Sequence, residues 1–223
     1  GNRIDVHSGL PKYMWVNANS SAIKDADAIC FYEDFVGYVL TGKRKVSYSS
    51  AARSMAFDIH KRCWSKELLD YAEIDISQLS EPCDAGTVIG TILPEMAEKL
   101  HLNPNMQVVV GGHDQSCAAL GSGLHNMEVG ECGMGTCEFM FMRLPEAKSD
   151  AVMIDSDLTC VPYVLPGAYL TSLEVTTCGI LKNWCMDTVL KSFKQECEAV
   201  GKNVFEEVDK RIEGKETGVI VLP

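Results

Sequence analysis

The spacing of hydrophobic positions along the chain predicts a mixture of helices and strands. In residues 28–40 the apolar side chains recur at the three, four, seven and eight spacing of one helix face, and Gly42 follows as a helix-ending glycine. Residues 43–57 are polar and small and are expected to form a loop. Other helices are expected from Pro11, after the N-cap Ser65, and over residues 94–100, 176–190 and 193–211. Strands are expected over residues 87–90, 107–110, 131–143, 158–164, 168–174 and 218–223.

The order of these elements predicts a layered α/β protein in two parts. Strands and helices alternate up to about residue 120, which is the rhythm of a layered α/β core. A glycine-rich polar stretch, GSGLHNMEVG over residues 121–130, separates this part from a strand-rich one. We therefore expect a hinge at about residues 122–129, with domains over residues 1–123 and 124–223.

Composition and charge narrow the classes of partner. The chain has 223 residues with 20 Lys+Arg and 31 Asp+Glu, so its formal net charge is 20 − 31 = −11. This acidity argues against a nucleic-acid backbone or an anionic membrane surface as the main partner. No apolar run approaches the roughly 18 residues that a membrane span needs. The 10 cysteines show no CxxC pair, which favours reduced thiols and a cytoplasmic location.

The stretch VVVGGHDQSCAALGSG, residues 108–123, carries the first candidate chemistry. A strand, a Gly-Gly turn and a helix start would place Asp114 and Gln115 at the carboxyl edge of a sheet, where open α/β folds bind ligands. Asp114 suits a general base, and Gln115 can donate to and accept from a polyol. The plainer interpretation is that Asp114 caps the helix.

Two other interpretations of this stretch are weaker. His113 has no second ligand nearby in the sequence, so no metal-binding residue is assigned. A thiol enzyme that used Cys117 with His113 would need an exposed thiol of lowered pKa, yet Cys117 lies in an Ala-Ala-Leu segment that is expected to be buried.

Two glycine-containing segments are candidates for phosphate binding. Gly135 and Thr136, in GMGT, offer exposed N–H groups and a hydroxyl that together could hold a phosphate, although a tight hairpin explains the same residues. Gly179 opens the helix expected from residue 176, where a second phosphate could meet the helix dipole. Ordinary close packing of that helix against a sheet is the alternative.

Taken in order, the motifs resemble those of the FGGY family of carbohydrate kinases, over nearly the whole chain. The matching segments are LPKYMW (10–15), YVLTG (38–42), SSAARSMAFDI (49–59) with Trp64, GGHDQ (111–115), GMGT (133–136) and TCGILKNW (177–184). The chain departs from the usual pattern at Cys137, where many members have Ser, and at Thr177 and Cys178, which replace Ser-Gly or Gly-Gly.

The resemblance implies an actin-like, RNase-H-like ATPase fold with parts of two sugar-kinase domains flanking a cleft. It implies ATP and Mg²⁺ as cofactors and a small sugar, with xylulose among the candidates, as substrate. Asp114 would be the general base, Asp114 and Gln115 would bind the sugar, and Gly135, Thr136 and Gly179 would bind the ATP phosphates. A non-catalytic ATP-binding or sensor protein of the actin-like superfamily is the alternative.

Family members are about twice as long, and neither their DxGTxSxR phosphate loop nor their GGGxxS adenine motif is present here. The chain is therefore expected to be a central fragment. Alone it should be inactive, and unpaired strands and apolar faces should drive it to form homo-oligomers.

Overall fold

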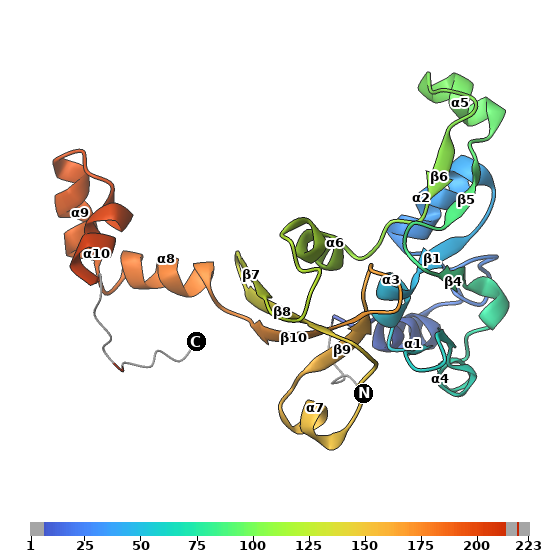
Figure 1. Cartoon of the computed structure of the whole chain (residues 1–223), viewed down its shortest axis with the longest axis horizontal. Helices are drawn as coiled ribbons and strands as arrows, with labels where there is room; N and C mark the ends of the chain where they lie inside the picture. The colour runs from blue at the N-terminus through green and yellow to red at the C-terminus, as the bar shows by residue number, and fades with distance from the viewer. Residues whose placement is uncertain (1–6, 213–217, 219–223) are drawn as a thin grey trace. The chain divides into compact units, whose positions relative to one another are not determined.

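The structure is a computed structural model that describes residues 7–212 and Gly218 (Figure 1). Its contacts divide the chain into two compact units. The first unit comprises residues 1–131 and 141–173, and the second comprises residues 132–140 and 174–223. The predicted boundary near residue 123 stays a prediction. No helix of the described residues is long and apolar enough to cross a membrane.

Most helices and strands belong to the first unit. Its helices are α1 (Gly9–Asn19), α2 (Tyr32–Thr41), α3 (Tyr48–Ala52), α4 (Lys66–Tyr71), η1 (Ile76–Gln78, a 3₁₀ turn), α5 (Pro94–Leu100), α6 (Asp114–Gly121) and α7 (Ala151–Asp155). Its strands are β1 (Lys45–Ser47), β2 (Phe57–Asp58), β3 (Cys63–Trp64), β4 (Glu81–Cys83), β5 (Val88–Thr91), β6 (Gln107–Val109) and β9 (Thr159–Pro162). The mixture of helices and strands agrees with the predicted α/β class.

The described strands form several small sheets. β1 pairs with β4 in parallel, whereas β2 with β3 and β5 with β6 are antiparallel pairs. A four-stranded sheet has the order β7-β8-β10-β9, in which β7 is Gly130–Met134, β8 is Glu138–Leu144 and β10 is Tyr169–Val175. β9 and β10 run antiparallel, with Leu170 opposite Val161.

The main core of the first unit lies between α1, α3, α4 and the short strands. Phe57 and Trp64 meet edge to face with ring centroids 5.8 Å apart, and the Trp64 indole N–H donates to the Ser80 carbonyl at 2.9 Å. The buried apolar residues of this core are Leu10, Ile23, Val46, Ala51, Ala52, Ala56, Phe57, Trp64, Leu69, Ala72, Ile74 and Leu79. Because Ala51 and Ala52 of α3 belong to this close-packed core, residues 47–52 are held firmly in place.

The second unit is mainly helical. Its helices are α8 (Gly179–Asp187), α9 (Lys191–Ala199) and α10 (Val204–Ile212). The single helix predicted over residues 193–211 is wrong, because the chain turns at Gly201, whose φ is +69°. Such a conformation suits glycine and cannot continue a helix.

Of the other predicted helix and strand boundaries, some are confirmed and some are wrong. The α5 bounds, the Ser65 cap of α4 and the Gly42 end of α2 are confirmed: the Ser65 side chain accepts from Leu68 N, and Gly42 is left-handed with φ +72°. The loop predicted for residues 43–57 is wrong, because it contains β1, α3 and the start of β2. The strand predicted over residues 218–223 lies outside the described residues apart from Gly218.

The helix predicted from residue 28 begins at Tyr32, because Ile29 is used in a parallel bridge to Leu79. Its apolar stripe does not face the core: Phe35 and Val36 are more than half exposed. The buried face is instead formed by Asp34, Gly37 and Thr41.

Candidate functional site

Asp114 is the first residue of α6, and His113 occupies the N-cap position. The capping interpretation of Asp114 is therefore wrong. The Asp114 side chain is 86% exposed, and its Oδ1 accepts from the amide of Gln115 at 2.7 Å. A carboxylate in the first turn of a helix is stabilised by the positive end of the helix dipole. The result is an accessible carboxylate that is fixed by its own helix.

The neighbouring His113 does not supply Asp114 with a positive partner. Its Nε2 lies 3.4 Å from Asp114 Oδ1. Burial lowers the pKa of His113 and the charge of Arg53 lowers it further, while Asp114 acts in the opposite direction. Since an ordinary histidine pKa is about 6.5, the imidazole is neutral at pH 7. Asp114 therefore lies beside a neutral imidazole at that pH.

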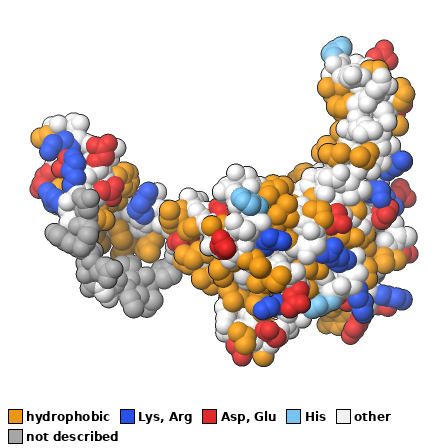
Figure 2. Space-filling model, in the orientation of Figure 1, with side chains coloured by type: hydrophobic (Ala, Val, Ile, Leu, Met, Phe, Trp, Pro, Cys, Tyr) orange, Lys and Arg blue, Asp and Glu red, His pale blue; other side chains and the backbone are white. Residues whose placement is uncertain are grey.

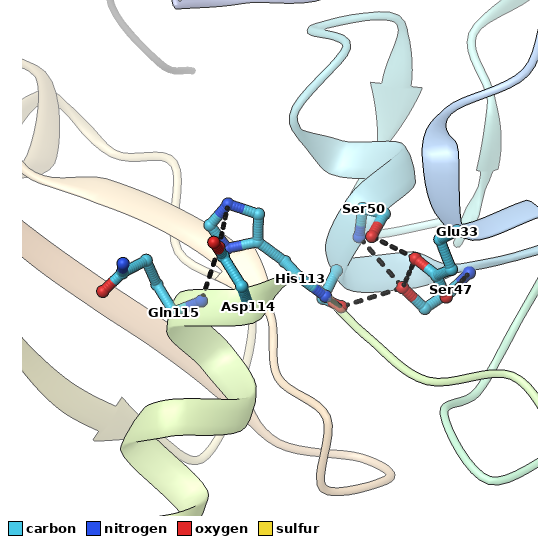
Figure 3. A network of polar contacts seen from close by, with 7 residues as sticks. Glu33, Ser47, Ser50, His113, Asp114 and Gln115 are labelled. Atoms are coloured by element: carbon cyan, nitrogen blue, oxygen red, sulfur yellow. Dashed lines mark hydrogen bonds and ion pairs between the residues drawn. The ribbon is translucent and has the colours of Figure 1, made fainter.

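Gln115 follows Asp114 on the same turn and is partly exposed. In Figure 3 its side chain extends away from His113, so its amide is available to a bound molecule. Asp114 and Gln115 thus occupy one helix turn, and their roles stay predictions.

Of the two glycines that precede α6, only the second, Gly112, is required for close packing. A Cβ on Gly112 would lie 2.3 Å from Val164 Cγ1, 3.2 Å from Ser49 Oγ and 3.3 Å from Cys117 Sγ. A Cβ on Gly111 would meet nothing within 4 Å. Gly112 therefore brings the start of α6 against α3 and Val164. In the preceding β6, Val109 is exposed.

Replacing Gly112 by Ala should destabilise the protein. Val164 is buried and short, so it has little room to move, and overpacking of this kind costs about 1–3 kcal/mol. In a protein of this size we expect the Tm to fall by roughly 2–4 °C per kcal/mol. Thermal unfolding of Gly112→Ala beside Gly111→Ala, the matched control, measures this. Equal melting temperatures for the two variants would contradict the packing described for Gly112.

The second group of candidate residues lies in the second unit. The chain turns between β7 and β8 at Gly135 and Thr136, and both residues are exposed. The backbone N–H of Gly179 donates to the Gly135 carbonyl, and that of Cys178 donates to the Thr136 carbonyl, both at 2.9 Å. A Cβ on Gly179 would lie 2.6 Å from the Gly135 oxygen. The structure therefore brings together the three predicted residues Gly135, Thr136 and Gly179, where α8 begins.

This arrangement suits an anion. α8 begins at Gly179, and although the Gly179 N–H is used by Gly135, the N–H groups that follow it in the first turn and the partial positive charge of a helix N-terminus face this end. Thr136 adds an exposed hydroxyl beside that start. Asp114 and Gln115 belong to the first unit, and these three residues belong to the second.

The thiol interpretation loses support. Cys117 is exposed, contrary to the prediction that it is buried, but burial of its sulfur, Glu33 and Asp114 all raise its pKa. A raised pKa disfavours the thiolate, which is the nucleophile.

Among the residues that the structure describes, no three His, Cys, Asp or Glu side chains are grouped to hold a metal ion. Mg²⁺ in nucleotide sites is bound by one or two carboxylates together with phosphate oxygens and water. No residue is therefore assigned to it.

Sequence reasoning missed one part of the site. Glu33, Ser47, Ser49 and Ser50 form hydrogen bonds beside His113 (Figure 3). The three serines belong to the SYSS segment, residues 47–50. Their hydroxyl groups are the only feature of the sequence that indicates a polar network here, and nothing in the sequence pairs them with Glu33.

Comparisons with known proteins agree with the motifs. Residues 1–121 match the model of the N-terminal domain of the FGGY family of carbohydrate kinases. A xylulose kinase from Lactococcus lactis is 31% identical over 180 residues, which are 80% of this chain and 35% of that protein. An autoinducer-2 kinase from Escherichia coli K12 is 27% identical over 219 residues, 96% of this chain and 41% of that protein. The chain thus spans well under half the length of these curated relatives.

The fold is also that of this family. The crystal structure of xylulose kinase from Rhodospirillum rubrum matches 97% of this chain and 42% of its own chain, with a TM-score of 0.84 and 20% identity. This likeness confirms the predicted actin-like α/β fold. The family model covers more than half of the chain and ends at α6, the helix that carries Asp114. The chain belongs to the FGGY family of carbohydrate kinases.

Proposed function

We propose that this chain forms part of an ATP-dependent sugar kinase, which transfers the γ-phosphoryl group of ATP to a hydroxyl of a small sugar or polyol. The observation that carries this proposal is the exposed carboxylate of Asp114 at the start of α6, inside the segment that matches the family. The relatives are longer, so we call a kinase of their full length that contains residues 1–223 the complete kinase.

In the proposed reaction Asp114 accepts the proton of the attacking sugar hydroxyl. The proton leaves as the oxygen forms its bond to phosphorus, so the carboxylate acts as a general base. The neutral His113 places no positive charge beside this carboxylate. Gln115, one residue along, donates to or accepts from a second hydroxyl and orients the sugar.

The second unit is proposed to bind the phosphates of ATP. The Thr136 hydroxyl and the N–H groups of the first turn of α8 that follow Gly179 are the proposed donors for phosphate oxygens. The N–H groups of Gly135 and Gly179 donate to carbonyls, so these two glycines bring the turn and the helix start together at the phosphates. Mg²⁺ bound with ATP supplies neutralisation of the phosphate charge. These residues position the nucleotide, which is the main source of rate in phosphoryl transfer.

Xylulose is the substrate that we favour. The GGHDQ and LPK…W segments support a pentulose, and one relative is named a xylulose kinase, although another is named an autoinducer-2 kinase. The test is sugar-dependent ADP formation by the complete kinase with pentuloses, hexuloses, gluconate and glycerol. We expect turnover with a pentulose. No turnover above the sugar-free rate with any of these compounds would contradict the proposal. The cysteine content supports a cytoplasmic enzyme.

Residues 1–223 alone should show no sugar-dependent ATP consumption. The chain supplies a base and part of a phosphate site, and catalysis needs the nucleotide, the metal and the sugar held together. A coupled assay for ADP, with and without sugar, measures this. Sugar phosphorylation by the chain alone would show that it contains a sufficient catalytic centre.

The same chain is expected to form homo-oligomers. On α2, Tyr32 is 93% exposed, and Phe35 and Val36 are also more than half exposed. Figure 2 shows hydrophobic side chains at many places on the face in view. Apolar surface of this kind favours self-association. Light scattering of residues 1–223 should show species above the monomer mass, and Phe35→Glu should reduce them. A monodisperse monomer would contradict this expectation.

A further inference from the structure

A chain of hydrogen bonds runs from α2 to the start of α6. The carboxylate of Glu33 accepts from the Ser47 hydroxyl at 3.1 Å and from the Ser47 amide at 3.2 Å. The Ser47 and Ser49 hydroxyls are 3.0 Å apart, and Ser49 Oγ accepts from the backbone N–H of His113 at 3.0 Å. Figure 3 shows Glu33, Ser47 and Ser50 on one side of this contact and His113 to Gln115 on the other.

The directions of these bonds leave one arrangement of protons. Ser47 gives its hydroxyl proton to the Glu33 carboxylate and accepts from the Ser50 amide at 3.1 Å. Its remaining lone pair takes the hydroxyl proton of Ser49, so Ser49 keeps its lone pairs for the His113 amide. Ser47 and Ser49 are almost completely buried, at 1% and 2% exposed. Water is therefore poorly placed to replace either hydroxyl.

The start of α6, which carries Asp114, is joined to this contact. The Asp114 carboxylate is bound within its own helix turn, by the Gln115 amide, so it moves with the start of α6. His113 is the residue that begins this turn, and its N–H is attached to α3 through Ser49. Gly112 lies against the same hydroxyl, since its Cβ would be 3.2 Å from Ser49 Oγ. α3 belongs to the main core, which makes Ser49 a fixed point.

We propose that Ser49 is a positioning residue for Asp114 and that Glu33, through Ser47, holds the Ser49 hydroxyl in place. This inference rests on the proposed role of Asp114 as the base. Ser49 acts through the His113 backbone and touches no substrate. Losing it should displace the carboxylate, and a misplacement of about 1 Å can cost roughly 100-fold in rate.

The test compares two buried serines of the same region in the complete kinase. Ser49→Ala removes the acceptor of the His113 amide. Ser54→Ala is the matched control, because the Ser54 hydroxyl is equally buried, accepts from the Ala56 amide at 2.9 Å and donates to the Ala51 carbonyl, away from α6. We expect Ser49→Ala to lower kcat by about 10- to 100-fold with the sugar KM changed less than about threefold. Ser54→Ala should lower the Tm to a similar degree and leave kcat within about twofold.

Hydrogen exchange gives a readout that needs no kinase activity. In residues 1–223 the His113 amide should exchange at least about tenfold faster in Ser49→Ala than in the wild type. In Ser54→Ala its exchange rate should be unchanged. Glu33→Gln keeps an oxygen for the Ser47 amide and should retain most of the protection, whereas Glu33→Ala should lose it.

The outcomes separate the two claims. A wild-type complete kinase with no sugar-dependent activity overturns the proposed function, and hydrogen exchange then decides whether Ser49 holds His113. An active wild type in which Ser49→Ala keeps its kcat, or loses kcat no more than Ser54→Ala does, overturns the positioning role. Unchanged exchange at His113 in a folded Ser49→Ala protein also overturns it.

Discussion

Replacing Asp114 by Asn in the complete kinase is expected to remove nearly all turnover while leaving sugar binding in place. Asn has the shape of Asp. Its side-chain oxygen can still accept the hydrogen bond from the Gln115 backbone N–H, which Asp114 Oδ1 accepts in the wild type at 2.7 Å. What is lost is the group that takes the proton. General-base catalysis contributes about 10²–10⁴ in rate, so kcat should fall by at least about 100-fold. The sugar KM should change less than about threefold, because a group that acts mainly in the transition state adds little to ground-state binding.

Steady-state kcat and KM for Asp114→Asn are best measured beside Glu95→Gln. Glu95 is also an exposed acid in the first turn of a helix, α5, so it controls for loss of charge at a helix start. We expect its kcat to stay within about twofold of the wild type, as for most surface changes. If Asp114→Asn retained more than about a tenth of the wild-type kcat, the general-base role would be excluded.

The second large effect is expected from Gly179→Ala. The new Cβ would lie 2.6 Å from the Gly135 carbonyl oxygen, and a backbone atom cannot swing aside as a flexible side chain can. The bond from the Gly179 amide to that oxygen, now 2.9 Å, would have to lengthen, and the β7–β8 turn would move away from α8. Overpacking of this kind costs about 1–3 kcal/mol. Because ATP is proposed to bind the turn and α8 in their present arrangement, restoring that arrangement would draw on the binding free energy, in which every 1.4 kcal/mol is tenfold in affinity. We expect kcat/KM for ATP to fall by about tenfold or more.

This effect should be specific to the nucleotide. The sugar KM, measured at saturating ATP, should change less than about threefold. Gly121→Ala is the control, because Gly121 is also helical and a Cβ there would meet nothing within 4 Å. Its kinetics should match those of the wild type. An unchanged kcat/KM for ATP in Gly179→Ala would remove the support for a phosphate site at this turn.

Features set by local chemistry could be predicted from the sequence. Gly42 ends α2 because it takes the left-handed conformation, and Ser65 begins α4 because its hydroxyl accepts from the Leu68 amide. Pro94 begins α5 as the sequence indicated. The candidate residues Asp114, Gln115, Gly135, Thr136 and Gly179 also come from short, continuous motifs, and their roles stay predictions.

Features set by contacts between residues far apart in the sequence could not be predicted. The polar, small residues of segment 43–57 predict a loop, whereas β1 within it is a strand through its parallel pairing with β4, in which Lys45 lies opposite Glu81. Its serines form a helix turn that is buried in the core, so tertiary packing overrides their weak helix propensity. The link from Glu33 through Ser49 to His113 joins three elements, and no periodicity or spacing predicts such a link.

The burial of α2 shows the same limit. The apolar spacing correctly indicated a helix, but it did not indicate which face is buried. Gly37 lies on the buried face because a side chain there would meet Ile89 at 2.8 Å, and Asp34 is buried with a hydrogen bond from the Ser80 hydroxyl. A buried glycine and a buried carboxylate contribute nothing to a hydrophobic pattern.

Identification of the product is the most direct test of phosphoryl transfer to a sugar. The complete kinase is incubated with ATP, Mg²⁺ and xylulose, and the sugar is analysed by mass spectrometry and ³¹P NMR beside the Asp114→Asn variant. We predict a sugar monophosphate formed in equal amount to ADP by the wild type, and almost none by the variant. ADP formed without any sugar phosphate, across the pentuloses, hexuloses, gluconate and glycerol, would contradict the kinase and favour an ATP-binding sensor of the same fold.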